Sequence, residues 1–125
     1  MTTVDPHTEK LLAFSVEQYR EQLQHGEKLA KMLRACEYSG LDAHVATLQE
    51  LQAVANQHDE QLLPLIKCEL ATCVEHPLYQ KRQSFITEII VLNKKLLPKI
   101  QNIKAVFAAE IDQLKGGRVA MHGYR

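Results

Sequence analysis

Three residues in the second half of the chain have side chains that could bind a metal ion. Cys68, Cys73 and His76 follow one another as Cys-x4-Cys-x2-His. A structural zinc site needs four ligands in a tetrahedron, and this stretch offers no clear fourth one. The sequence therefore predicts two small thiols beside the start of a helix, and no metal site.

Acid–base chemistry has one candidate, the neighbouring pair His58 and Asp59. Adjacent residues of a helix point to different faces, so these two side chains are not expected to act as a dyad. The chain contains no Glu-x-x-His or His-Glu-x-x-His pattern and no glycine-rich phosphate loop. The sequence predicts that the protein is not an enzyme and uses no cofactor.

Length and composition predict a single domain over residues 1–125. The apolar fraction is 46% and the charged fraction 24%, which is typical of a globular chain with a core. No apolar run is long enough to span a bilayer, and the first residues lack the pattern of a secretory signal. Three cysteines without a framework spacing suit a reducing compartment. We therefore expect a cytoplasmic protein without membrane insertion.

Charge is divided unevenly along the chain although its net value is zero. Residues 1–76 hold 6 basic and 12 acidic side chains, and residues 77–125 hold 9 basic and 3 acidic ones. In an antiparallel bundle the basic last segment would lie against the acidic segments before it. The basic residues form no dense patch, so nucleic-acid binding is not expected.

Helical periodicity runs through the whole chain, and no strand pattern is found. It predicts an all-α fold, an antiparallel bundle of three long helices at about 6–39, 42–75 and 77–115, with a tail at 116–125. Asp5 and Asp42 are the expected N-caps, and Gly40 and Gly116-Gly117 the expected helix ends. Pro64 predicts a kink or a break that would turn the second helix into two.

Two neighbouring apolar stripes mark the third helix, and Pro98 is expected to bend it. They are Phe85, Ile89, Leu92, Leu96 and Ile103, and Ile86, Ile90, Leu97, Ile100, Phe107, Ile111 and Leu114. Because this helix is longer than the first, its far end is expected to be partly uncovered. An uncovered apolar stripe of this kind favours docking of an amphipathic helix from a partner, or self-association as a homodimer.

Residues 88–124, EIIVLNKKLLPKIQNIKAVFAAEIDQLKGGRVAMHGY, resemble the C-terminal helix of the FliT family of flagellar export chaperones. The similarity lies in Leu92-Asn93, Leu96-Leu97, Leu114, Gly117-Arg118, Ala120 and Tyr124. The layout of the first two segments, a long helix, a short turn near Gly40 and a second helix rich in Leu and Gln, is also similar. Two residues depart from the family pattern, Pro98 in the last helix and Val119 after the Gly-Arg pair.

The resemblance implies a cytoplasmic chaperone that holds the filament-cap subunit before type III flagellar export. For some members it also implies contacts with the export ATPase machinery or with a flagellar transcription activator. Chaperones of hook–filament junction proteins have a similar layout and remain an alternative, as does a self-associating structural helical protein without cargo. The residues that we expect to contact the partner are Leu96, Ile100, Ile103, Phe107, Ile111, Leu114, Arg118 and Tyr124.

Overall fold

The computed structural model describes the backbone of residues 3–123 and the side chains of residues 3–109 and of Asp112. Every regular element in these residues is a helix, which confirms the all-α prediction. The helices are α1 (Pro6–Arg34), α2 (Leu41–Cys68), α3 (Leu70–Cys73) and α4 (Pro77–Gly123). The chain divides into two compact units, Met1–Asn93 and Lys94–Arg125, and the boundary falls inside α4.

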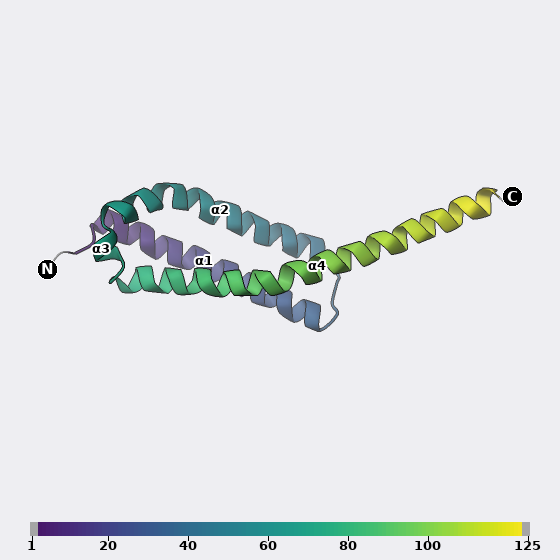
Figure 1. Cartoon of the computed structure of the whole chain (residues 1–125), viewed down its shortest axis with the longest axis horizontal. Helices are drawn as coiled ribbons and strands as arrows, with labels where there is room; N and C mark the ends of the chain where they lie inside the picture. The colour runs from purple at the N-terminus through teal and green to yellow at the C-terminus, as the bar shows by residue number, and fades with distance from the viewer. Residues whose placement is uncertain (1–2, 124–125) are drawn as a thin grey trace. The chain divides into compact units, whose positions relative to one another are not determined.

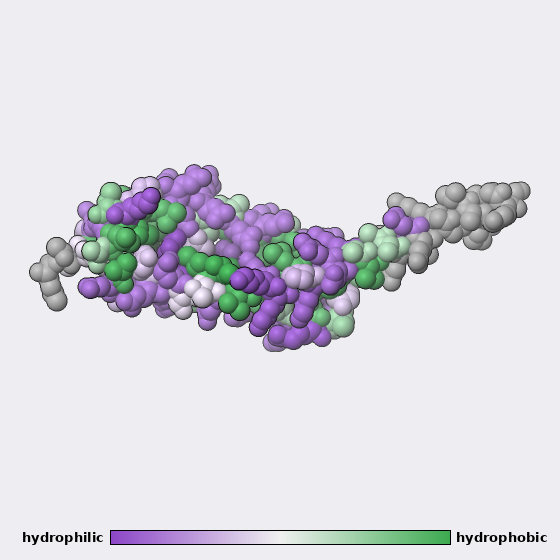
Figure 2. All heavy atoms as spheres, in the orientation of Figure 1, coloured by the Kyte–Doolittle hydropathy of each residue, from purple (hydrophilic) through white to green (hydrophobic). Residues whose placement is uncertain are grey.

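In the first unit, α1, α2 and the part of α4 before Lys94 run side by side (Figure 1). The short α3 lies near the beginning of the chain and connects α2 to α4. Cα atoms of α1 and α2 approach one another within 8 Å, so these two helices pack directly on each other. Apolar side chains reach the surface between polar ones on the face shown in Figure 2.

Helix α1 begins where the sequence predicts and ends earlier. Asp5 accepts a hydrogen bond from the His7 N–H at 2.8 Å, and Pro6 takes the first helical position, where no N–H is needed. The helix ends at Arg34, not near residue 39. Cys36 has a positive φ of 55°, and the Glu37 N–H donates to the Met32 carbonyl at 2.9 Å, a Schellman-type ending.

Helix α2 differs from the prediction at both ends. It begins at Leu41 after Gly40, whose φ of 72° is left-handed, so Asp42 lies inside the first turn and is not the N-cap. Its carboxylate there still complements the positive end of the helix dipole. Pro64 lies within the helix and does not break it, since a proline removes one donor but keeps a helical φ. The break comes five residues later, at Glu69.

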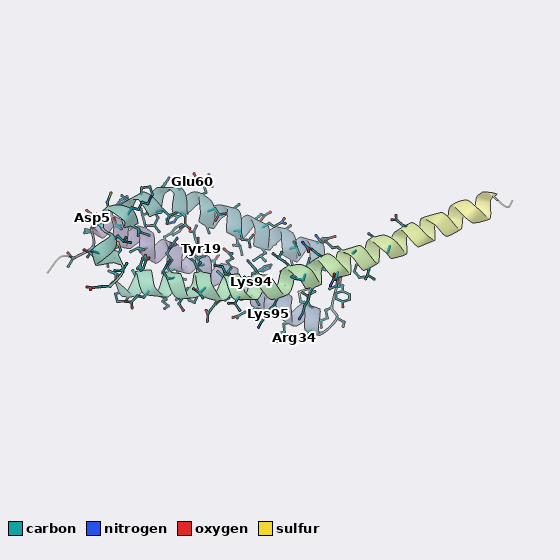
Figure 3. The ribbon with its side chains drawn as sticks, viewed as in Figure 1. Asp5, Tyr19, Arg34, Glu60, Lys94 and Lys95 are labelled. Atoms are coloured by element: carbon teal, nitrogen blue, oxygen red, sulfur yellow. The ribbon has the colours of Figure 1, made fainter. Side chains whose placement is uncertain are left out.

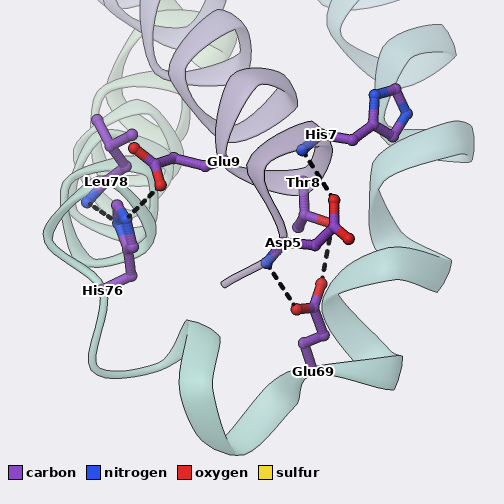
Figure 4. A network of polar contacts seen from close by, with 7 residues as sticks. All are labelled: Asp5, His7, Thr8, Glu9, Glu69, His76 and Leu78. Atoms are coloured by element: carbon purple, nitrogen blue, oxygen red, sulfur yellow. Dashed lines mark hydrogen bonds and ion pairs between the residues drawn. The ribbon is translucent and has the colours of Figure 1, made fainter. Parts of the chain in front are cut away.

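Hydrogen bonds to Glu69 explain why the chain can leave the helix there (Figure 4). The Asp5 N–H donates to Glu69 Oε1 at 2.8 Å, and the Thr8 hydroxyl donates to Glu69 Oε2 at 2.9 Å. Glu69 itself has a φ of −122°, outside the helical range. One carboxylate thus joins the start of α1 to the junction of α2 and α3.

Helix α4 starts at Pro77 as predicted, and the His76 ring nitrogen Nδ1 accepts the Leu78 N–H at 3.0 Å. It then continues through Pro98 and through Gly116-Gly117 to Gly123, so the predicted end at residue 115 is wrong. Glycine costs a helix about 1 kcal/mol relative to alanine but does not forbid it, and no proline follows to stop this one.

The core of the first unit consists of side chains from α1, α2, α3 and the part of α4 before Lys94. One cluster holds Val4, Leu12, Leu62, Ile66 and Cys73, and another holds Tyr19, Leu23, Ala55 and Ile89. Ile89 of the first predicted stripe and Ile86 of the second both pack in this core, whereas Ile90 and Leu97 of the second stripe are about half exposed. Within the residues that were described, no helix has the length and apolar character needed to cross a membrane.

Candidate partner-binding surface

The predicted contact residues that the structure describes lie in the second unit and differ in exposure. Leu96 and Ile100 are buried, Ile103 is partly buried, and Phe107 is 40% exposed. They recur at intervals of three and four residues and so share one face of the helix. We call this face the strip; by spacing it continues to Ile111 and Leu114, whose side chains lie outside the description.

Two lysines border the strip. Lys99 and Lys104 are both exposed, and at 100° per residue they fall on opposite edges of the apolar face. Val106, next to Phe107, is 54% exposed but lies off the strip. The second unit therefore presents an amphipathic helix with an apolar face and basic borders. The side chains of Arg118 and Tyr124, also predicted contacts, lie outside the described residues, and their role stays a prediction.

The first unit contains a buried polar network that the sequence did not lead us to expect. Arg82 of α4 is 4% exposed, and its Nη2 lies 2.9 Å from Oδ2 of Asp59 in α2. Arg82 Nε donates to the Ser15 hydroxyl of α1 at 2.9 Å. The hydroxyl of Tyr19, also in α1, donates to the same carboxylate oxygen of Asp59. Figure 3 shows Tyr19 between the helices, and the network joins all three of them.

Burial determines the charge states of the groups in this network. The Arg82 guanidinium also lies 5.3 Å from the centre of the Tyr19 ring, a cation–π distance. Burial raises the pKa of Tyr19 to about 12, and the hydrogen bond to Asp59 adds to the effect. Tyr19 therefore stays a neutral donor. Because a buried charge without its partner is costly, the network specifies which faces of α1, α2 and α4 meet.

His58 of α2 lies beside this network without joining it. Its ring packs against Phe14 of α1 with the ring centres 4.9 Å apart. Both ring nitrogens are shielded from solvent and have no hydrogen-bond partner within the described part of the chain. This desolvation lowers the pKa of His58. As the sequence predicts for neighbours on a helix, the two side chains have different contacts: Asp59 pairs with Arg82, and His58 packs against Phe14.

Two separate depressions lie on the surface of the first unit. One depression of about 560 Å³ is lined by α1 residues that include Lys10, Phe14 and Glu17. A second, of about 200 Å³, is lined by residues of both helices that include Glu21, Glu50 and Val54. The α1 residues of both depressions follow one another on one face of the helix.

The cysteines and His76 are not arranged as a metal site. Cys73 is fully buried in the core, Cys68 is exposed, and His76 bonds the Leu78 N–H while its Nε2 lies 3.7 Å from Glu9 (Figure 4). Burial raises the pKa of the Cys73 thiol, and the charge of Glu69 adds to this. Among the residues whose placement is described, no group of three or more His, Cys, Asp or Glu side chains could hold a metal ion.

Comparisons with models of protein families, with curated proteins and with solved structures give no match for this chain. Its function must therefore be argued from its own residues. The features that invite a functional argument are the strip in the second unit and the two depressions on the first.

Proposed function

We propose that the protein is a cytoplasmic flagellar export chaperone that binds the filament-cap subunit through the strip and keeps it competent for type III export. The proposal rests on the resemblance of residues 88–124 to the FliT family. The observation that supports it most directly is the 40% exposure of Phe107 on an apolar helix face with lysines on both edges. In this proposal the protein is a binding protein without catalytic activity or cofactor.

Covering the terminal helix of an export substrate is a task that suits such a surface. Export substrates present amphipathic terminal helices that would self-associate or be degraded when left alone. A helix face with apolar residues at intervals of three and four can cover the apolar side of such a segment. Ordering the segment costs free energy, so the affinity is moderate and the cargo can be released. The export ATPase machinery or a transcription activator would be further partners of the same chaperone.

The proposal is tested by binding a C-terminal fragment of a flagellar cap subunit to the purified chain. We expect Phe107→Glu to weaken binding at least about tenfold, since a charge would be buried in the centre of the contact. Helical content and thermal stability should stay nearly unchanged. Val106→Glu is the matched control, because Val106 is the exposed neighbour that lies off the strip.

Three results would count against the proposal. Wild-type protein that fails to bind the cap fragment contradicts the cargo, and binding of a hook–filament junction fragment instead would assign it to that group of chaperones. Equal loss of binding in both variants would show that the strip is not the contact. A collapse of thermal stability in Phe107→Glu would show that Phe107 belongs to a core.

A further inference from the structure

The smaller of the two depressions on the first unit has a lining that selects a ligand by charge. It is formed by α1 and α2 and has a volume of about 200 Å³; we call it the α1–α2 depression. Its lining residues are Gln18 and Glu21 of α1 and Thr47, Glu50, Leu51 and Val54 of α2. None of these described residues is basic, whereas Lys10 as well as Glu17 lines the larger depression. We infer that the α1–α2 depression binds a primary alkylammonium group, the group of an aliphatic amine or of a lysine side chain.

Every polar side chain of this lining can accept a hydrogen bond. Glu21 and Glu50 are exposed carboxylates on different helices, and neither forms an ion pair within the described part of the chain. The Thr47 hydroxyl donates its proton to the Ala43 carbonyl at 3.0 Å, so its oxygen remains available as an acceptor. An ammonium group has three donors and no acceptor, which makes it the complement of this set.

Gln18 gives a second reason, independent of the two carboxylates, to expect a ligand that donates hydrogen bonds. Its Oε1 is shielded from solvent and accepts no hydrogen bond from any described residue, although the side chain lines the depression. One turn further along α1, Gln22 is only 5% exposed, and its Oε1 is likewise without a donor in the described residues. A shielded acceptor without a donor is unfavourable, and a ligand that brings N–H groups to Gln18 removes that cost.

The apolar part of the lining suits the alkyl stem of the same ligand. Leu51 is partly buried and Val54 is 52% exposed, so a stem that covers them removes apolar surface from water. Lysine stems commonly lie on apolar surface in this way while the charged end reaches a polar group. The volume is below the roughly 300–1,000 Å³ of pockets for drug-sized ligands, so the ligand is a small amine or a single side chain.

Acceptors that come from two helices favour an ammonium group over a guanidinium group. A guanidinium is a planar fork that matches the two oxygens of one carboxylate, whereas the three donors of an ammonium point in different directions. Glu21 and Glu50 line the depression from α1 and α2, respectively. A cation bound between these two like charges also relieves their repulsion.

The test is a titration of the full chain with n-butylamine near neutral pH, followed by the NMR shifts of its backbone amides. We expect shifts concentrated around residues 18–21 and 47–54, with a Kd on the order of millimolar. n-Butyltrimethylammonium carries the same stem and charge but no N–H donor, and it should bind at least about tenfold more weakly. n-Butylguanidinium should also bind more weakly, because its planar fork fits acceptors on two helices less well.

Two variants remove the acceptors, and one control changes the same charge elsewhere. Glu21→Gln/Glu50→Gln should weaken binding of n-butylamine at least about tenfold. The control Glu27→Gln/Glu60→Gln replaces one exposed glutamate on each of the same two helices outside the depression, and it should bind as wild type does. Gln18→Leu should weaken binding at least about fivefold, while its thermal stability stays equal or rises because an unpaired acceptor is removed.

The inference is overturned when n-butylamine causes no localised shifts up to about 50 mM. It is also overturned when the control pair weakens binding as much as Glu21→Gln/Glu50→Gln, or when the trimethylammonium or guanidinium probe binds as tightly as n-butylamine.

Two further probes distinguish the source of the ammonium group. Tighter binding of 1,5-diaminopentane supports a free aliphatic amine, and tighter binding of Nα-acetyl-lysine methylamide supports the lysine of a partner protein. The depression is formed by α1 and α2 of the first unit alone, so none of these results bears on the strip or on the proposed function.

Discussion

The two units of this chain are stabilised by different interactions. In the first, side chains far apart in the sequence meet: Leu12 packs with Leu62, and Arg82 bonds Asp59 and Ser15. In the second, the hydrogen bonds of one helix connect residues only four apart, and most described side chains are exposed. A region of the first kind can fix a shape, whereas a region of the second kind is suited to offer a surface to a partner. The following variants test this division.

The largest effect is expected from breaking the buried network. Arg82→Met should lower the free energy of unfolding by about 3–5 kcal/mol, because it leaves the Asp59 carboxylate buried without its cation. Urea denaturation followed by circular dichroism measures it. The control Lys81→Met changes the same charge at the exposed neighbouring position and should change stability by less than about 0.5 kcal/mol.

A second replacement tests whether this loss of stability comes from the unpaired Asp59 carboxylate. If the loss comes from the unpaired carboxylate, adding Asp59→Leu to Arg82→Met should recover part of it, since a buried ion pair can be replaced by apolar groups at little cost. If Arg82→Met alone is as mild as Lys81→Met, the network does not hold the first unit together.

The next effect compares one leucine from each unit. Leu62 is fully buried in the core of the first unit, and Leu97 of the second is 55% exposed. Leu62→Ala should cost about 2–5 kcal/mol because it removes buried methyl groups and leaves a cavity. Leu97→Ala should cost less than about 0.5 kcal/mol. Equal losses in the same denaturation experiment would contradict the division into a packed unit and a surface-bearing helix.

The helices themselves were predictable because their apolar residues recur with a helical period. The seam of Leu12, Val16, Tyr19 and Leu23 is buried as expected. The ends were less predictable, since they depend on contacts that are distant in sequence. The helix breaks at Glu69, whose carboxylate accepts hydrogen bonds from the Asp5 N–H and the Thr8 hydroxyl. Both partners lie more than 60 residues earlier in the chain, so the sequence around Pro64 does not indicate them.

The buried network was missed because charged residues are normally assigned to the surface. A signal for it was nonetheless present in the spacing. Asp59 continues the buried series of Ala55, Leu62 and Ile66, and Arg82 precedes Phe85 by three residues and Ile89 by seven. An acidic and a basic residue that each occupy a core position by helical spacing predict a buried ion pair. The strip could be predicted as apolar, but its partner could not, because periodicity does not say what covers a face.

The smallest effect concerns His58 and the pH dependence of stability. Desolvation lowers the pKa of folded His58 below the ordinary value of 6.5, the charge of Asp59 opposes this, and Arg82 adds to the lowering. As the pH falls through 6.5, the unfolded chain therefore takes up a proton on this residue before the folded chain does. The unfolded state binds more protons in that window, so the contribution of neutral His58 is complete above pH 6.5 and is lost below it.

His58→Gln should accordingly flatten the fall of the urea midpoint between about pH 7.5 and about pH 5.5. The groups around the ring are Phe14, Asp59 and Arg82, and the variant leaves all three in place. His7→Gln is the control, because His7 is exposed and its replacement should leave the slope as in wild type. If both variants flatten the slope equally, the shielded position of His58 in the first unit has no part in it. If only His58→Gln flattens the slope, the shielded position of His58 in the first unit causes this part of the pH dependence.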